Sequence, residues 1–332
     1  MLVVGSILGC RTTSLAIAAA MSLGRSPFSK VDLRRFNTAA ATNEDTLRQQ
    51  IEETKKRNIL DEREKMFKMV GNSDHALIAA VFAKWNEHDA KQKFCDLLGL
   101  SPMGLRDMRH LVMQYDSALK SMGFAVEKES DANSKSWRVV RSCVIAALAP
   151  SQLVRIQRPS TKYSETLSGA LEKDAEAKEI KLYVRVGAEN TSLSDASSSS
   201  CNTRYHGIKE ERVFIHPSSS NFSVGHFNCP WLVYHELVRT SKPFLQDATE
   251  CSAYALLLFG GDIEVQASNG LILVDGWVRL SASARIGALI GGLRRKVDEL
   301  LSNKVANPRL DITGSTEIKT VVKLLVGDGL RH

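Results

Sequence analysis

The chain has 332 residues, of which 43% are hydrophobic and 24% are charged, and this balance is typical of a soluble globular protein. It excludes a wholly disordered chain, a collagen, a disulfide-stabilised miniprotein and a multi-span membrane protein. The formal net charge of +7 is compatible with a polyanionic partner, although charge alone does not demonstrate one.

The first residues are apolar, and the segment from Met1 to Ser26 carries only two charges, Arg11 and Arg25. A secretory signal places its charges before the apolar stretch, whereas Arg11 interrupts this one. Because no Asp or Glu occurs in the first 30 residues, a mitochondrial presequence is one interpretation. A buried helix of a domain that begins upstream is the other, and both stay open.

Helical periodicity dominates the chain up to residue 150. Ser73 and Ser101 are predicted to cap helices, and Pro102 suits the first helical position after Ser101. The predicted helices span residues 14–23, 43–68, 74–87, 102–122 and 142–148. The highly charged helix 43–68 is expected to be a solvated surface helix. The apolar stripe of helix 102–122, which includes Met108 and Met122, is expected to pack in the core.

Beyond residue 150 the pattern changes to short segments rich in Val, Ile, Tyr, Phe and Trp, which predict the strands of a small barrel or sandwich. These strands span residues 182–186, 212–216, 231–238 and 271–280. A last amphipathic helix spans 284–301, and its apolar residues, among them Ile286, Leu289, Ile290 and Val297, are expected to face inward. Residues 187–203 include four consecutive serines and predict an inserted loop. Asp247 and Glu250 are predicted to lie in a loop. The expected fold class is therefore α+β, an all-α bundle followed by a small all-β barrel with a C-terminal helix.

Sites for nucleotide hydrolysis, nucleophilic catalysis or metal binding are not indicated. The segment nearest to a phosphate-binding loop, Gly5–Thr12, has Arg11 where the lysine belongs, and no acidic DExH-like box occurs. Ser73, Asp74 and His75 have the residue types of a catalytic triad, but triad members are seldom sequence neighbours. His226, Cys229, His235 and Cys251 lack the short repeated spacings of a closed zinc site. We therefore expect no cofactor in this chain.

Polar and basic residues follow two of the predicted strands. His216–Asn221 comes after one strand, and Arg239–Lys242 comes after another. Hydroxyl groups, backbone N–H groups and a cation at the end of a strand can hold a phosphate or sugar of a single nucleic-acid strand. These two segments are the candidate binding loops.

The same segments carry a family resemblance. RVFIHPSSSNF (212–222), PWLVYHELVRTSK (230–242), YALLLFGG (254–261) and VDGWV (274–278) together resemble the C-terminal OB-fold of DEAH/RHA-type RNA helicases, on the RNA-helicase-A-like branch. SDHALIAAVFAKW (73–85) and the segment 94–115 resemble the helical ratchet bundle of that family. The family's RecA-like lobes and most of its winged helix are missing.

This resemblance implies an organisation into four parts. Residues 1–28 would be the end of a winged helix and the start of the helicase-associated domain, 29–125 a ratchet-like bundle, 126–151 a connecting segment, and 152–332 the OB-fold with the insertion 187–203 and the C-terminal helix. The implied function is an accessory region that grips single-stranded or structured RNA for RecA-like lobes present in cis or in trans.

The resemblance also implies which residues lie near the RNA. They are Thr240, Ser241 and Lys242, preceded by Arg239, together with His216, Ser218 and Ser219 on a neighbouring strand end and Arg106 and Arg109 on the ratchet helix. Trp231 and Tyr234 either stack a base or are alternating core positions of a strand, and both interpretations stay open. G-patch-type or other protein activators are the implied protein partners. ATP and Mg²⁺ belong to the parent family, whose ATPase residues have no counterpart here, so this chain is expected to be inactive alone.

The sequence leaves two questions open, one about the extent of the protein and one about its function. The chain is either a C-terminal fragment of a longer helicase or a separate chain without a motor. Its function is either RNA binding or, alternatively, that of a protein-interaction scaffold for an RNA-processing or ribosomal assembly, which the +2 charge of residues 151–332 favours. Six scattered cysteines indicate an intracellular location, which could be the nucleus, the cytoplasm or the mitochondrion.

Overall fold

The computed structural model describes residues 1–29, 43–124, 126, 129–159, 162–166, 169–173, 176–186, 203–205 and 208–327. In the described part of the chain before residue 150, every regular element is a helix. These helices are α1 (Leu2–Ile7), α2 (Arg11–Ser22), α3 (Asn43–Val70), α4 (Asp74–Glu87), α5 (Lys91–Leu98), α6 (Pro102–Ser121) and α7 (Trp137–Leu148).

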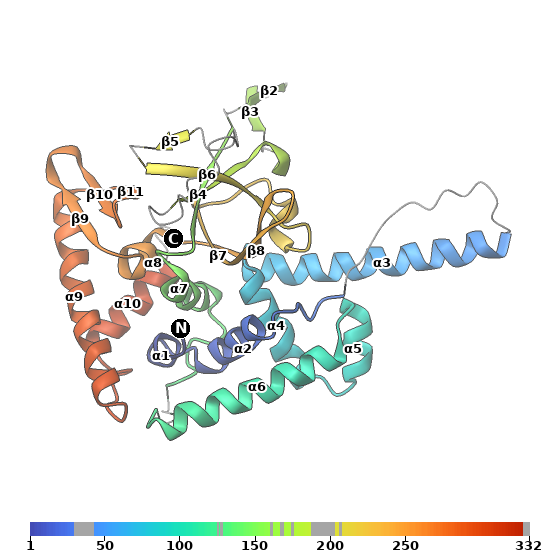
Figure 1. Cartoon of the computed structure of the whole chain (residues 1–332), viewed down its shortest axis with the longest axis horizontal. Helices are drawn as coiled ribbons and strands as arrows, with labels where there is room; N and C mark the ends of the chain where they lie inside the picture. Colours follow the sequence, from blue (N-terminus) through green and yellow to red (C-terminus); the bar gives the residue numbers. More distant parts are fainter. Residues whose placement is uncertain are drawn as a thin grey trace.

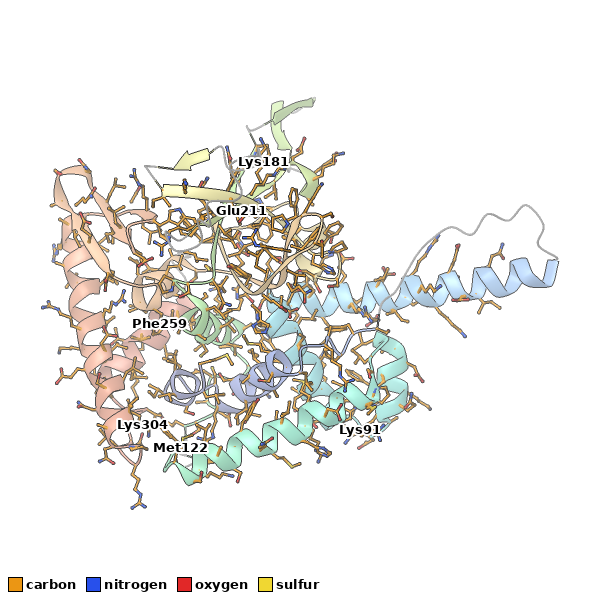
Figure 2. The ribbon with its side chains drawn as sticks, viewed as in Figure 1. Lys91, Met122, Lys181, Glu211, Phe259 and Lys304 are labelled. Atoms are coloured by element: carbon orange, nitrogen blue, oxygen red, sulfur yellow. The ribbon has the colours of Figure 1, made fainter. Side chains whose placement is uncertain are left out.

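Helices α4 and α6 begin where the sequence predicts. The Oγ atom of Ser73 accepts a hydrogen bond from the backbone N–H of Ala76 at 3.1 Å, and Ser101 caps α6 in the same way through Gly104 at 3.1 Å. The buried face of α6 holds Met108, but Met122 just beyond the helix is 57% exposed. The prediction that Met122 packs inward is therefore wrong, because the helix has ended and its last turn reaches the edge of the molecule (Figure 2).

Helix α3 extends away from the rest of the molecule, as Figure 1 shows. Its surface carries pairs of opposite charge one turn apart, such as Lys56 with Glu52 and Lys68 with Glu64, each at 2.7 Å. Such exposed pairs add little stability individually. They agree with the prediction of a solvated helix.

Five strands close into a barrel. In the described residues between 150 and 250, the strands are β1 (Leu153–Gln157), β2 (Lys162–Thr166), β3 (Gly169–Lys173), β4 (Lys181–Arg185), β5 (Thr203–Tyr205), β6 (Ile208–Ile215), β7 (Trp231–Arg239) and β8 (Pro243–Glu250). The hydrogen-bonded order β4–β1–β7–β8–β6 returns to its start because β6 also pairs with β4. All neighbours are antiparallel except β6 and β8, which are parallel. This closed five-stranded arrangement is that of an OB-fold.

Alternation along the strands fills the barrel. Val213 on β6, Leu232 on β7 and Leu245 on β8 are almost fully buried in one apolar cluster. Residues next to them on each strand therefore point away from the barrel interior. Asp247 and Glu250 lie on β8, so the prediction that they occupy a loop is wrong. The polar and charged residues of β8 interrupt the apolar alternation that would predict a strand.

The C-terminal part adds a second small sheet. Helix α8 (Ala253–Phe259) is followed by β9 (Ile263–Gln266), β10 (Leu271–Val274) and β11 (Val278–Ser281), and then by α9 (Ala284–Ala306) and α10 (Thr316–Gly327). The predicted strand 271–280 is thus a hairpin outside the barrel, because Asp275 and Gly276 adopt positive φ angles of 52° and 65° and reverse the chain. Two helices follow where one was expected.

One apolar core joins the three parts. It includes Val81 of α4, Ile145 of α7, Trp231 of β7 and Trp277, whose ring meets that of Trp231 edge-on at 4.9 Å. Helix α7 lies centrally in Figure 1 and contacts α1, α4, α8, α10, β7 and β8, so much of the expected connecting segment 126–151 is a core helix. The expected insertion 187–203 lies outside the described residues except for Thr203.

The outer face of α9 departs from the prediction. Ile290 and Val297 are buried as expected, but Ile286 is 48% exposed and Leu289 is 66% exposed. Their predicted inward packing is wrong because α9 lies at the edge of the molecule and covers β9 with one side only (Figure 1). Within the described ranges, we find no helix that is both long and apolar enough to span a membrane.

Candidate nucleic-acid interface

The turn between β7 and β8 presents the predicted segment Arg239–Lys242 to solvent. The backbone N–H of Thr240 donates to the carbonyl of Lys242 at 3.2 Å, which makes the turn tight. Arg239, Thr240, Ser241 and Lys242 are all exposed. The Nζ atom of Lys242 lies 4.9 Å from the centre of the Phe214 ring on β6, so the ring holds this cation against the barrel.

Arg239 is already paired. Its Nη1 and Nη2 atoms donate to the two carboxylate oxygens of Glu211 at 2.5 and 2.7 Å. Hydrogen bonding to Glu211 raises the pKa of Arg239 above its usual value. This arginine therefore fixes the end of β7 against β6 (Glu211 is labelled in Figure 2), and a phosphate would have to compete with a carboxylate for it.

The loop after β6 holds His216 and Ser218 together. The Nδ1 atom of His216 lies 2.7 Å from the Ser218 hydroxyl and accepts the Ser218 backbone N–H at 3.2 Å. The His216 ring also meets Phe244 of β8 edge-on at 5.8 Å. This places the loop directly beside the β7–β8 turn.

Ser219 has a different position from its neighbours. It is buried, and its Oγ atom donates to the Asp74 carboxylate of α4 at 2.5 Å. The same Oγ accepts the backbone N–H of Asn221 at 3.1 Å. Ser219 thus supports the loop from beneath and presents no free hydroxyl to a ligand.

Two aromatic rings that sequence reasoning missed lie among these residues. Phe214 and Phe244 are partners in the parallel pairing of β6 and β8, and their ring centres are 6.2 Å apart. Both are half-buried, and both point outward because their neighbours Val213 and Leu245 fill the barrel. The guanidinium of Arg212 lies 5.1 Å from the Phe214 ring centre.

We call this set the aromatic–basic cluster: Arg212, Phe214, His216, Lys242 and Phe244. Apolar rings with cations beside them can stack a nucleobase and hold the adjacent phosphate, without reading base sequence. The strand alternation in RVFIH could have revealed the outward position of Phe214. The contact with Phe244, 30 residues away along the chain, depends on the parallel pairing of the two strands.

Arg106 and Arg109 are exposed on α6, on the side of the molecule opposite the barrel (Figure 1). The Nε atom of Arg106 donates to the carbonyl of Pro102 on its own helix at 3.2 Å. Helix α6 packs against α2 and α5. The structure therefore does not bring these two arginines together with the aromatic–basic cluster.

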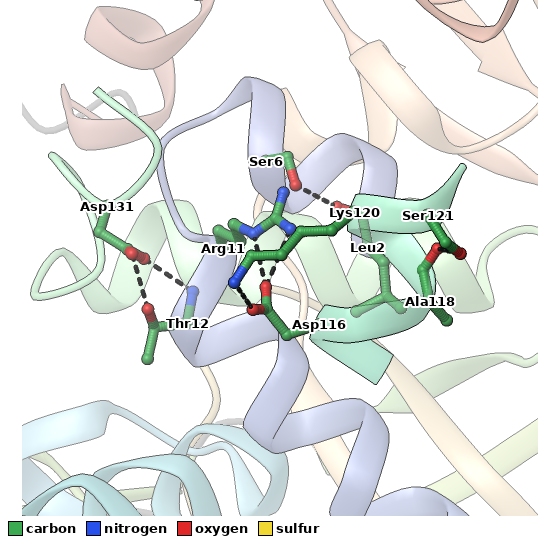
Figure 3. A network of polar contacts seen from close by, with 9 residues as sticks. All are labelled: Leu2, Ser6, Arg11, Thr12, Asp116, Ala118, Lys120, Ser121 and Asp131. Carbon is green, nitrogen blue, oxygen red and sulfur yellow. Dashed lines mark hydrogen bonds and ion pairs between the residues drawn. The ribbon is translucent and has the colours of Figure 1, made fainter. Parts of the chain in front are cut away.

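A partly buried ion pair helps to hold α6 in place (Figure 3). The Nε and Nη2 atoms of Arg11 on α2 donate to one oxygen of Asp116 at 3.1 and 2.9 Å, and Lys120 contacts the other oxygen at 2.6 Å. Burial acts to raise the pKa of Asp116, but the hydrogen bonds from Lys120 and Arg11 outweigh it and lower the pKa. Arg11 therefore anchors α6 and has no phosphate-binding role.

Trp231 and Tyr234 were open between stacking a base and packing in the core. Trp231 is 3% exposed and contacts Trp277, so it belongs to the core. Tyr234 is half-buried, and desolvation by burial is the main cause of its raised pKa. Among the described residues, no cluster of three or more His, Cys, Asp or Glu side chains could hold a metal ion.

Comparison with known proteins agrees with this geometry. The family model described as the oligonucleotide/oligosaccharide-binding (OB)-fold matches residues 140–263, and the one described as the C-terminal domain in RNA helicases matches residues 270–327. The first contains the barrel from β1 to β8, with α7 and α8 at its ends. The second covers β10, β11 and the two last helices.

Relatives of this chain are helicases of much greater length. A putative DEAH-box ATP-dependent helicase of Mycosarcoma maydis is 29% identical over 370 residues, which cover 99% of this chain and 20% of the relative. The DExH-box ATP-dependent RNA helicase DExH1 of Arabidopsis thaliana is 30% identical over 98% of this chain and 27% of the relative. The ATP-dependent DNA/RNA helicase DHX36 of Bos taurus is 30% identical over 76% of this chain and 23% of the relative. The chain spans about a fifth to a quarter of these relatives.

Proposed function

The chain belongs to the C-terminal region of the DEAH/RHA-type RNA helicases, and from this premise we propose that it grips single-stranded RNA for a RecA-like motor. The single observation that carries the proposal is the aromatic–basic cluster on the outer face of the barrel. Stacking on Phe214 or Phe244 and phosphate contacts from Lys242 and Arg212 would make binding tolerant of sequence and sensitive to salt.

The helical part completes this proposal as a ratchet-like bundle. Its exposed α6 arginines, Arg106 and Arg109, would contact the RNA at a second place, away from the barrel. In this proposal, the helices up to α6 form the bundle, strands β1 to β8 form the OB-fold, and α7 is the core helix between these two parts. We further propose that ATP and Mg²⁺ act on the RecA-like lobes and are not bound by these residues.

A scaffold function has its own supporting observation. Ile286 and Leu289 are exposed one turn apart on α9, and apolar side chains on an outer helix suit a protein partner. Protein activators of the G-patch type are one class of partner that such a surface could serve. The RNA proposal is preferred because the aromatic–basic cluster combines rings with cations, as nucleic-acid binding requires.

Reversing the charge of Lys242 tests the RNA proposal. We expect Lys242→Glu to weaken binding of a single-stranded RNA of about 12 nucleotides by roughly tenfold, because it removes a phosphate contact and repels the strand. Fluorescence anisotropy at low salt measures the affinity.

The matched control is Lys319→Glu, which makes the same charge change at an exposed lysine on α10. It should leave the affinity within about twofold of the unchanged chain. Equal effects of the two variants, or no binding by the unchanged chain, would reject the cluster as the RNA site and favour the scaffold.

A further inference from the structure

Four consecutive residues at the start of α4 bind strand β8. The backbone carbonyl of Asn72 accepts the N–H of Glu250 at 2.9 Å, and its side-chain amide donates to the Glu250 carboxylate at 2.8 Å. The Ser73 hydroxyl and the Nδ1 atom of His75 contact the Thr249 hydroxyl at 2.7 and 2.8 Å. The carboxylate of the remaining residue, Asp74, accepts a hydrogen bond from the backbone N–H of Ala248. The helical part and the barrel therefore meet along one continuous line.

Asp74 is the centre of this joint. Its Oδ2 atom accepts hydrogen bonds from the Ser219 hydroxyl at 2.5 Å, the Ala248 N–H at 2.9 Å and the Asn221 side-chain amide at 3.3 Å. Its Oδ1 atom accepts the Ser220 N–H at 2.8 Å. All four donors belong to the barrel, and Asp74 is only 5% exposed.

These bonds fix the loop that carries part of the aromatic–basic cluster. Ser219 and Ser220 directly follow Ser218, whose hydroxyl contacts His216. Asn221 also donates to the carbonyl of Ala248 at 2.9 Å, so the loop, strand β8 and helix α4 are all tied together at this point. The same strand β8 carries Phe244. A carboxylate from the helical part thus holds two segments of the candidate interface in register.

We propose that Asp74 is the positioning residue of the RNA interface, and that the helical part sets the conformation of the barrel loop 216–221 through it. This inference rests on the proposed RNA binding. Asp74 touches no RNA itself. It acts by keeping His216 beside Phe244, which aligns the rings for stacking. The tripeptide Ser73–His75, whose residue types suggest a catalytic triad, serves this joint instead.

Asparagine and alanine at position 74 would each leave part of this joint without an acceptor. An asparagine offers one acceptor oxygen, so its amide would face either Ser220 N–H or Ala248 N–H, and two donors would meet in a buried place. An alanine leaves all four donors without this acceptor. Both variants should therefore release the loop, while the rest of the core keeps its contacts.

Two measurements on the full chain test the inference. Hydrogen exchange reports the Ser220 and Ala248 amides, and anisotropy with a single-stranded RNA of about 12 nucleotides reports binding. We expect Asp74→Ala to speed exchange of both amides by about tenfold or more and to weaken RNA binding by about three- to tenfold. Asp74→Asn should show smaller changes of the same kind, and Asp74→Glu should restore part of both.

Glu317→Ala is the control, since it removes a half-buried carboxylate on α10, outside both proposed RNA contact regions. It should leave both amides protected and RNA binding unchanged. If Asp74→Ala does not fold, Ser219→Ala removes one of the four bonds, and it should still speed exchange at Ser220. In the double variant Asp74→Ala/Ser219→Ala, binding should be no weaker than in Asp74→Ala alone.

The outcomes separate this inference from the proposed function. Unchanged exchange at Ser220 and Ala248 in Asp74→Ala and Ser219→Ala would overturn the positioning role. Faster exchange with undiminished RNA binding would overturn it as well, provided that Lys242→Glu weakens binding. If neither Lys242→Glu nor Asp74→Ala affects RNA binding, the proposed function fails, and the positioning of an RNA interface fails with it.

Discussion

At the scale of single residues, the aromatic–basic cluster would bind RNA in two ways, by stacking of bases on rings and by attraction of phosphates to cations. Phe244 offers a ring without charge, whereas Lys242 offers charge without a ring. A base stacked on an aromatic ring gains about 1–3 kcal/mol, and this gain does not depend on counterion release. The two residues should therefore respond differently to salt.

Phe244→Leu should weaken RNA binding by about 1–3 kcal/mol without changing the slope of log affinity against log salt concentration. Leucine keeps an apolar side chain on β8 but removes the ring. Phe259→Leu, at a half-buried ring on α8, is the control and should leave the affinity unaltered. A change in slope, or equal losses in the two variants, would show that stacking on Phe244 is not involved. Anisotropy titrations at several salt concentrations measure both quantities.

Asp247 gives the barrel a dependence on pH. Burial, followed by the nearby charges of Asp74 and Glu236, raises the pKa of Asp247 to about 7 from its usual 3.8. The folded state therefore holds a proton that the unfolded chain releases. Protonation of Asp247 therefore stabilises the folded state fully below pH 3.8, and this stabilisation is lost as the pH rises through about 7.

Asp247→Asn should remove this loss, because the amide stays neutral and tolerates the φ angle of 50° at this position. We expect the variant to be more stable by about 1–2 kcal/mol at pH 8, a figure reduced for partial exposure, and nearly unchanged at pH 4. Urea unfolding at the two pH values measures the free energy. Equal effects at both values would mean that the pKa of Asp247 is not raised in the folded protein.

At the scale of elements, an ion pair adds to the apolar packing of α6 against α2. The Arg11 side chain is 3% exposed and Asp116 is 24% exposed (Figure 3). Removing the carboxylate leaves a guanidinium in a poorly hydrated place. The lowered pKa of Asp116 also means that the pair stabilises the fold above the usual value of 3.8 and is lost as the pH falls below it.

Asp116→Ala should therefore lower the free energy of unfolding by about 2–3 kcal/mol at pH 7, less than for a fully buried pair because Asp116 is partly exposed. The difference from the unchanged protein should shrink as the pH falls through 3.8. Chemical denaturation followed by circular dichroism measures it. A difference that stays constant down to pH 3 would show that charge is not the source of the stabilisation.

The elements that the sequence predicts are those with strong local signals. Helices α4 and α6 begin at Ser73 and Ser101, where a hydroxyl caps a long apolar stripe. Strand β8 was missed, because PFLQDATE breaks the apolar alternation and Asp247 adopts a positive φ. The sequence predicts one strand where β10 and β11 form a hairpin, because the reversal at Asp275 and Gly276 is short.

The candidate site was predictable in part for the same reason. The polar loops after β6 and β7 stand out in the sequence, and the structure brings His216, Ser218 and Lys242 to one end of the barrel. The Phe214–Phe244 contact depends on a parallel pairing between distant strands. The burial of Ser219 depends on Asp74, 145 residues earlier in the chain. Both are tertiary contacts without a local signal.

At the scale of the whole molecule, the helical part, the barrel and the C-terminal helices share one core around α7. The barrel, which carries the aromatic–basic cluster, and helix α6, which carries Arg106 and Arg109, lie on different sides of this body (Figure 1). A strand that reached both would have to pass along the molecule, so a short RNA should report on the barrel alone. This makes a short oligonucleotide the appropriate ligand for the central test.

The most direct measurement is the affinity of the unchanged chain for a short single-stranded RNA at salt concentrations from about 50 to 200 mM. If Arg212 and Lys242 each neutralise one phosphate, log affinity should fall with log salt concentration with a slope of about −1.4. Two RNAs of different sequence should give nearly the same line. No binding at the lowest salt concentration, or an affinity that does not depend on salt, would contradict the account.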